Sequence, residues 1–366
     1  MSNPTSTMNP SDSFTVFVGA YTGNGVSTGV HIYRLDKAAG KLTPLATCEV
    51  ENASFLSLDP SRRFLYAVNE QGMTAGQPGG GLSAFGFDKQ SGTLSLLNRQ
   101  LTHGSAPCYV SVDQTNRYAL VANYSQGNVV MFPIQSDGSL APASDMHQHQ
   151  GSSTNVQRQK AAHAHCFVID PGNRFAHAAD LGAEKVYTYR LDLVDGKLLP
   201  HAELTTRAGS GPRHLTYHPN GKWAYLLHEL DSTLAMLSYD AEVGRFEELQ
   251  HLSMLPDDFT GESYAAEVRV SPDGRFVYAS NRGHDSIAIF AIDPTTGRMT
   301  VVDRASSGGK IPRNFCIAPS GAYMVAANQE SNNLVVFRVD AASGKLTPID
   351  EVSGVHKPVC VQIYDL

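Results

Sequence analysis

The segment Asp340-Ala341-Ala342-Ser343-Gly344-Lys345-Leu346 shows the spacing that decides the fold: an Asp, three residues, a Gly, a polar residue and an apolar residue. This motif recurs along the chain, with full copies at residues 36–40, 88–92, 192–196, 240–244 and 293–297 and a shortened copy at 137–138. Successive glycines lie 46 to 58 residues apart, which is too long for a helical solenoid unit and fits a four-stranded sheet. Seven such units fill the chain and predict an all-β, seven-bladed β-propeller with four antiparallel strands per blade.

A second repeat describes the inner half of each blade. Ser271-Pro272 precedes an alternating segment with Tyr278 and Asn281, and similar turns with a Pro occur in other units. This pattern favours a tight hairpin of two strands, A and B, and the Asp-to-Gly motif then joins strands C and D.

The two ends of the chain complete the ring. Residues 14–21 match a strand B without a strand A before it, and residues 358–364 match a strand A with nothing after it. We therefore expect one blade to be assembled from both termini, which removes free sheet edges. Residues 1–13 are predicted to be a disordered tail and residues 14–366 a single domain.

Composition limits the class of partner. The 366 residues are 42% hydrophobic and 17% charged, as in ordinary globular proteins, and the net charge of −7 argues against nucleic acid. The polar first 13 residues resemble neither a signal peptide nor a membrane anchor. Five scattered cysteines fit a reduced state in the cytoplasm. We expect a small-molecule substrate and no membrane partner; the oligomeric state stays open, with a monomer as the simplest case.

The blade alignment places charged residues near the axis on one face. Six residues before each turn Pro or its equivalent, at the start of strand A, the chain has Ser54, Cys108, His165, Arg213, Ala266 and Arg313. Ten residues after it, at the end of strand B, it has Glu70, Tyr124, Leu181, Glu229, Arg282 and Gln329. Both positions lie at the same end of a blade, and charges gathered there are costly unless they are paired or functional.

Three long segments leave the blades at this same end: Gln71–Gly81, Pro142–Ala162 and Ser253–Tyr264. The turns at the opposite end stay short. Long loops at one end of a rigid scaffold usually frame a binding site.

Structural interpretations compete with the functional ones. Arg213 and Glu229 could form an ion pair that only stabilises the ring, and a lone His165 could be a hydrogen-bonded core histidine. His163-x-His165 is a weak metal signal because no partner motif accompanies it. His147 and His149 are expected to lie in a polar loop and to have no role.

Three stretches resemble a known family: Gly211-Pro212-Arg213-His214, Asn281-Arg282-Gly283 and Ala162-His163-Ala164-His165. They are similar to the seven-bladed propeller lactonases, which include bacterial 6-phosphogluconolactonases and fungal 3-carboxy-cis,cis-muconate lactonizing enzymes. The resemblance extends from about Phe14 to the C-terminus. It implies a catalytic set of His165, Arg213, Glu229 and Arg282, which the blade alignment selects independently.

The leading hypothesis is hydrolysis of a sugar δ-lactone, most simply 6-phosphogluconolactone, with no cofactor and no metal. His165 would act as general base and Arg213 or Arg282 would stabilise the oxyanion, with Glu229 orienting an arginine or the imidazole. The candidate substrate-binding residues are Arg313, Glu70, His163, Gln329 and Glu267, with Arg313 holding the phosphate. Carboxymuconate cycloisomerisation, hydrolysis of an unphosphorylated aldonolactone and a non-catalytic interaction platform stay open as alternatives.

Overall fold

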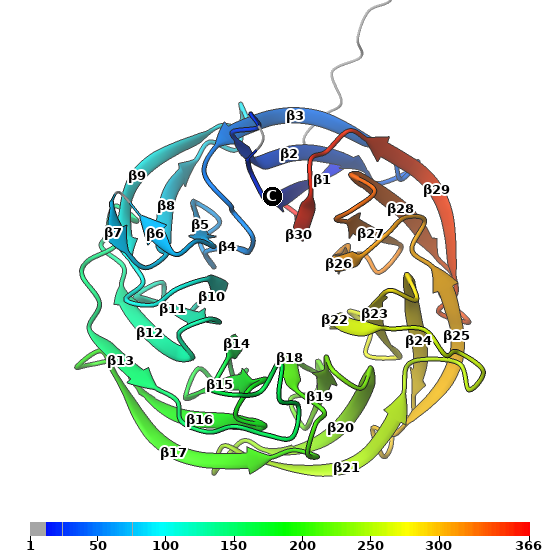
Figure 1. The fold of residues 1–366 in the computed structure, drawn as a ribbon. Helices are drawn as coiled ribbons and strands as arrows, with labels where there is room; N and C mark the ends of the chain where they lie inside the picture. Colours follow the sequence, from blue (N-terminus) through cyan, green and yellow to red (C-terminus); the bar gives the residue numbers. More distant parts are fainter. Residues whose placement is uncertain (1–11, 24, 75) are drawn as a thin grey trace, which may run out of the picture.

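The computed structural model describes residues 12–23, 25–74 and 76–366. Seven four-stranded antiparallel sheets surround a central axis, as the repeats predict (Figure 1). A short two-stranded ribbon, β6 (Met73–Thr74) and β7 (Gln77–Pro78), lies in one of the predicted long loops. In the described part of the chain, no helix has the length and hydropathy needed to cross a membrane.

The two inner strands of each blade form the predicted A–B hairpin. Strand A, nearest the axis, is in blades 1 to 7 β30 (Pro358–Tyr364), β4 (Leu56–Leu58), β10 (Pro107–Val112), β14 (Ala164–Ile169), β18 (Pro212–Tyr217), β22 (Tyr264–Val270) and β26 (Pro312–Ile317). Strand B is β1 (Ser13–Ala20), β5 (Phe64–Asn69), β11 (Tyr118–Asn123), β15 (Phe175–Asp180), β19 (Trp223–His228), β23 (Phe276–Arg282) and β27 (Tyr323–Asn328).

The two outer strands form the C–D hairpin. Strand C is β2 (Thr28–Asp36), β8 (Gly81–Phe87), β12 (Asn128–Pro133), β16 (Lys185–Asp192), β20 (Thr233–Asp240), β24 (Ser286–Ile292) and β28 (Asn333–Val339). Strand D is β3 (Leu42–Glu49), β9 (Leu94–Leu101), β13 (Asp145–Gln148), β17 (Lys197–Thr205), β21 (Arg245–Ser253), β25 (Met299–Ser306) and β29 (Leu346–Ser353).

The two termini close the ring as predicted. β1 pairs with β30 in antiparallel register, with Thr15 opposite Tyr364 and Val18 opposite Val361. The strand begins at Ser13, one residue before the expected start of the domain. Residues 1–11 of the predicted tail lie outside the described residues.

One expected loop is partly a strand. Within the segment 142–162, Asp145–Gln148 forms β13, the short outer strand of blade 3. The Asp137-Gly138 hairpin is shortened, so the chain first makes a single bridge between Ile134 and Leu140. Pairing then resumes at Asp145, after the proline at 142 has interrupted it.

Packing between blades explains why the Asp-to-Gly motif repeats. The Asp340 carboxylate accepts the Ser343 N–H at 2.8 Å, and Gly344 turns the chain at φ +71°. A Cβ at Gly344 would lie 2.5 Å from the ring of Phe276 in blade 6, and Tyr278 donates its hydroxyl to the Gly344 carbonyl at 2.9 Å. The glycine therefore serves both the turn and the contact with the preceding blade. Each motif holds two blades together.

Candidate active site

Bulges in the innermost strands direct the first ring of residues toward the axis. In β10, β14, β18 and β26 the pairing with strand B skips one residue, and the skipped residues are Cys108, His165, Arg213 and Arg313. A β-bulge turns an extra residue out of the regular alternation of a strand and re-aims its side chain. The four side chains that the repeat aligned are thus the bulged residues of their blades.

The second ring follows strand B and is fixed to the first by backbone hydrogen bonds. The N–H of Glu229 donates to the Gly211 carbonyl at 2.8 Å, two residues before the bulged Arg213. In blade 3 the equivalent hydrogen bond runs from the Tyr124 N–H to the Ala106 carbonyl, at 2.8 Å. In blade 1 the residue equivalent to Glu229 and Tyr124 is Tyr21. Strand ends from neighbouring blades therefore present both rings at one end of the propeller.

The two rings enclose a pocket of about 130 Å³. Its lining residues are Glu70, Cys108, Tyr124, Arg158, His165, Arg213, Glu229, Arg282 and Arg313. All four expected catalytic residues line it, together with Arg313 and Glu70 from the expected substrate-binding set. Four guanidinium groups and two carboxylates give the lining a net charge of +2, whereas the whole chain carries −7.

Glu229 is the centre of an arginine cluster. Its Oε2 lies 2.5 Å from Arg213 Nη1 and 3.1 Å from Arg282 Nη2, and its Oε1 lies 2.6 Å from Arg158 Nη2. Burial opposes ionisation of this carboxyl, but the guanidinium groups of Arg282, Arg213 and Arg158 hold its pKa well below the usual range. Glu229 is therefore a carboxylate that orients arginines and a very weak base. The ion pair with Arg213 exists, but it belongs to a larger network that lines a pocket.

His165 is neutral in this environment. Burial, followed by the nearby charge of Arg213, lowers its pKa well below the usual value of 6.5. Its Nε2 lies 2.5 Å from Arg213 Nη1, and because a guanidinium only donates, Nε2 accepts and the proton of the neutral ring is on Nδ1. The tautomer is thus assigned by the hydrogen bond.

Arg282 and Arg313 differ in how far the protein satisfies them. Arg282 donates to the carbonyls of Tyr264 at 3.2 Å and Ala265 at 3.1 Å. Burial lowers its pKa to about 9, which leaves it protonated at neutral pH. Arg313 lies over the Tyr21 ring, 5.7 Å from its centre, and pairs with no carboxylate among the described residues. Its donors are thus available for an anionic ligand.

The blade alignment did not identify Arg158. This residue lies in the 142–162 loop, and its Nη2 donates to the Tyr124 hydroxyl at 3.1 Å as well as to Glu229. Its guanidinium also lies over the ring of Tyr264 at 5.7 Å. The loop therefore does lie on the site face, as expected, but Arg158 has no counterpart in other blades from which an alignment could find it.

Three expected substrate-binding residues do not line the pocket. His163 stacks on the Tyr124 ring at 4.6 Å and contacts its carbonyl through Nδ1 at 2.9 Å. Gln329 donates to neighbouring Glu330 at 2.7 Å instead. Glu267 is buried and pairs with His214 at 3.2 Å.

The interpretation of His149 was wrong. Its ring is buried, with Nδ1 2.7 Å from the Asp180 carboxylate and Nε2 3.0 Å from the Tyr189 hydroxyl. Asp180 also accepts the backbone N–H of His163 at 2.6 Å. His149 therefore anchors the long loop to blade 4, a role that a polar loop sequence does not reveal.

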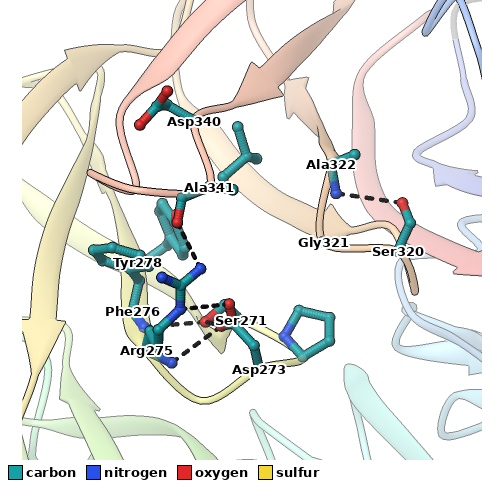
Figure 2. A pocket seen from close by; sticks show the side chains of 12 residues that line it. Ser271, Asp273, Arg275, Phe276, Tyr278, Ser320, Gly321, Ala322, Asp340 and Ala341 are labelled. Carbon is teal, nitrogen blue, oxygen red and sulfur yellow. Dashed lines mark hydrogen bonds and ion pairs between the residues drawn. The ribbon is translucent and has the colours of Figure 1, made fainter.

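A larger cavity, about 410 Å³, opens between blades 6 and 7 at the end opposite the candidate site. Figure 2 shows that its arginine is already satisfied: Arg275 bonds to Asp273 at 2.8 Å and to the Ala341 carbonyl at 2.5 Å. Val339 lines the cavity and stands where blade 5 has Tyr239, whose hydroxyl reaches across to Asp170 in blade 4. We interpret this cavity as a packing gap between blades.

Metal ligands are not gathered at the site. Within residues 12–23, 25–74 and 76–366, no group of three or more His, Cys, Asp or Glu side chains is arranged to hold a metal ion. His163 Nδ1 contacts the Tyr124 carbonyl, and His165 Nε2 contacts Arg213.

The structure is a seven-bladed propeller with a pocket of net positive charge at one axial end, and comparison with known proteins gives its family. The sequence profile described as "Lactonase, 7-bladed beta-propeller" matches residues 15–363. The chain belongs to this lactonase family.

Individual relatives agree with the profile. The chain is 39% identical over 300 residues to a 6-phosphogluconolactonase of Bacillus subtilis, covering 82% of this chain and 83% of the relative. It is 31% identical over 316 residues to a 6-phosphogluconolactonase of Formosa agariphila, covering 82% and 86%. The structure of the periplasmic gluconolactonase PpgL of Pseudomonas aeruginosa superposes with a TM-score of 0.91 at 36% identity, covering 96% of this chain and 99% of that one.

Proposed function

We propose that the protein hydrolyses 6-phosphogluconolactone to 6-phosphogluconate in the pocket around Glu229. The observation that carries this proposal is the net charge of +2 on the pocket lining. A phosphate monoester carries about −1.5 to −2 at pH 7 and matches that charge. The named relatives from Bacillus subtilis and Formosa agariphila support the same substrate.

Arg313 is the proposed phosphate ligand. It is the pocket arginine that pairs with no carboxylate among the described residues, whereas Arg158, Arg213 and Arg282 all contact Glu229. A guanidinium can hold two phosphate oxygens with parallel N–H donors. Glu70, 3.0 Å from the Tyr21 hydroxyl, helps to keep Tyr21 beside Arg313.

The reaction proposed for the pocket is attack of water on the lactone carbonyl. Negative charge then develops on the carbonyl oxygen, and the N–H groups of Arg213 or Arg282 stabilise it. The water proton passes to His165, and the C–O bond of the ring breaks as the same proton reaches the leaving oxygen, giving a carboxylic acid and a hydroxyl group.

The base at His165 is coupled to substrate binding. In the free pocket Arg213 occupies the Nε2 lone pair of His165. A substrate oxygen that accepts from Arg213 competes for that donor and releases Nε2 to take a proton. Because burial makes His165 a weak base, a reactive lactone is the substrate that this arrangement suits best.

A second candidate substrate is the unphosphorylated gluconolactone. The specific observation in its favour is the 36% identical gluconolactonase PpgL. The same chemistry would serve, and Arg313 would then face a sugar hydroxyl.

Location in the cytoplasm is also a proposal. The five cysteines are unpaired, which is consistent with a reducing compartment, although one relative is described as periplasmic. Cell fractionation with an antibody to the protein decides between the two compartments.

Hydrolysis assays with the purified protein test the substrate. We expect kcat/KM for 6-phosphogluconolactone to exceed that for gluconolactone by about tenfold or more, because a charge-assisted contact contributes about 1.5–3 kcal/mol. Equal values would transfer the proposal to the unphosphorylated lactone. Turnover of carboxymuconate without hydrolysis of either lactone would contradict lactone hydrolysis.

A further inference from the structure

A small cavity lies beside His165, next to the candidate pocket, and Arg213 and Arg313 line both. It has a volume of about 10 Å³, and Ser54, His165, His214 and Asn314 are among its lining residues. A volume of this size holds about one water molecule.

Three residues that line this cavity each have a buried polar atom without a hydrogen-bond partner among the described residues: His165 Nδ1, His214 Nε2 and Ser54 Oγ. Each of the three residues is 4% exposed. A buried polar group without a partner is costly, and ordered water commonly satisfies such groups when two to four of them converge.

The protonation states of the two rings are complementary. His165 accepts from Arg213 at Nε2, so its Nδ1 carries a proton and can donate. His214 Nδ1 contacts Glu267 Oε1 at 3.2 Å, and since a carboxylate only accepts, His214 donates there and its Nε2 has a free lone pair. The rings lie 5.1 Å apart, centre to centre, in an edge-to-face arrangement. A water that accepts from His165 and donates to His214 fits both.

Glu267 is itself held firmly. It accepts from Asn314 Nδ2 and from the Val268 N–H at 3.0 Å, and Arg269 Nε lies 3.5 Å away. Burial favours the neutral acid, but Arg269 and His214 lower the pKa of Glu267, so it is a carboxylate. The cost of a buried charge is thus offset, and the carboxylate can fix the ring of His214.

We infer that a water molecule bound between His165, His214 and Ser54 links the buried Glu267 to His165, and that Glu267 and His214 are positioning residues for that base. The link fixes the proton of His165 on Nδ1 and leaves Nε2 as the atom facing Arg213 and the pocket. Its catalytic consequence rests on the proposed lactone hydrolysis, whereas the water site does not. It assigns Glu267 a role behind the base in place of the expected contact with substrate.

A crystal structure of the unliganded protein, at a resolution that shows ordered water, tests the site itself. We expect a water within about 2.7–3.2 Å of both His165 Nδ1 and His214 Nε2. A cavity without density, or direct contact of the two rings, would overturn the inference whatever the protein catalyses.

Kinetics test the link to His165. His214→Phe should lower kcat about tenfold or more and leave KM within about twofold, because the lost interaction orients a base and touches no substrate. In a His165→Gln background the same substitution should have no further effect, since coupled residues are not additive. His177→Phe, an equally buried histidine outside the site, is the matched control and should leave kcat unchanged.

The outcomes separate the two proposals. If the wild type hydrolyses no lactone, the proposed function fails and the crystal structure alone decides the water site. If hydrolysis occurs but His214→Phe lowers kcat by the same factor in both backgrounds, the link to His165 is wrong. Ser54→Ala, which removes only a hydroxyl, provides the same comparison should His214→Phe fail to fold.

Discussion

The most unusual residue is Glu229, a carboxylate with three guanidinium partners. Burying these charges is costly unless they are paired, and three arginines exceed the charge of the one carboxylate that they contact. The surplus of positive charge around the pocket remains unneutralised by protein groups. This excess is the physical reason to expect an anionic ligand, and it distinguishes the pocket from an ion pair that only stabilises the ring.

Arg158→Ala should weaken substrate binding with little effect on stability. Its side chain is 34% exposed and belongs to a loop, so its removal disturbs little packing. Loss of a charge-assisted contact of about 1.5–3 kcal/mol corresponds to a rise in KM of roughly ten- to a hundredfold. Steady-state kinetics and thermal unfolding measure the two effects.

Arg174→Ala is the control for this substitution. Arg174 is also half-exposed and pairs with Glu242 at 3.5 Å at the other end of the propeller. It should leave both KM and the melting temperature nearly unchanged. An equal rise in KM in both variants would show that Arg158 acts only through net charge.

The sequence predicted that His165, Arg213, Glu229 and Arg282 lie together because they occupy equivalent positions in repeated blades, and all four line the pocket. Glu267 was misplaced for a physical reason. In blade 6 the count from the turn Pro gives Ala266, and Glu267 is the next residue, whose carboxylate contacts His214 and Asn314 instead of lining the pocket. Successive side chains of a strand point in opposite directions, so an acidic residue one position away from the aligned one does not reach the pocket.

At the scale of elements, the contact between one blade's C–D turn and a side chain of the preceding blade, such as that of Gly344 with Phe276, sets the repeat. Burial differs between inner and outer strands. All six residues of β11, a strand B, are buried, whereas β29, a strand D on the rim, has only exposed and half-buried residues. These features were predictable because alternation and turn glycines are local. The strand pairing after the shortened Asp137-Gly138 turn depends on contacts with neighbouring strands, so it was not predictable from the local sequence.

Gly344→Ala should destabilise the propeller more than a similar change elsewhere. The new Cβ would add a clash with Phe276 at 2.5 Å to the strain of φ +71°. We expect about 2–4 kcal/mol less free energy of unfolding in urea, combining roughly 1 kcal/mol of backbone strain with 1–3 kcal/mol of overpacking.

Gly221→Ala is the matched control, because its φ is +69° and nothing lies within 4 Å of the added Cβ. Its free energy of unfolding should fall only by the backbone strain, about 1 kcal/mol. Equal losses in the two variants would mean that the contact between blades does not constrain the turn.

At the scale of the whole molecule, buried histidines make stability depend on pH. Burial lowers the pKa of His177 and of His228 to about 3 and that of His251 to about 4, from a usual value of 6.5. Below pH 6.5 the unfolded chain binds protons that the folded chain does not. Stability is therefore complete above about pH 6.5 and falls as the pH decreases toward the folded-state values.

Urea unfolding at pH 7.5 and 5.5 measures this dependence. Each of these histidines should lower the free energy of unfolding by about 1.4 kcal/mol at pH 5.5, one unit below its pKa in the unfolded chain. Asp231, whose pKa burial raises to about 6, acts in the opposite direction and offsets part of the loss. His177→Phe should reduce the difference between the two pH values. A free energy of unfolding independent of pH would contradict the assigned neutral states.

The ring as a whole gives the pocket its rigidity. The terminal strands β1 and β30 close it, and all seven blades contribute to the pocket or to its immediate neighbours, in order through Tyr21, Glu70, Tyr124, His165, Glu229, Arg282 and Arg313. Residues spread over most of the chain are thus held at fixed distances without a mobile domain.

The most direct test of the account is kcat/KM for 6-phosphogluconolactone in Arg213→Ala, measured alongside its thermal unfolding. Arg213 contacts both His165 and Glu229, so it belongs to every step proposed for the pocket. We predict a loss of about 2–5 kcal/mol in transition-state binding, or roughly 30-fold to several thousandfold in kcat/KM, in protein that is still folded. Wild-type kcat/KM in folded Arg213→Ala protein would contradict the assignment of this pocket as the active site.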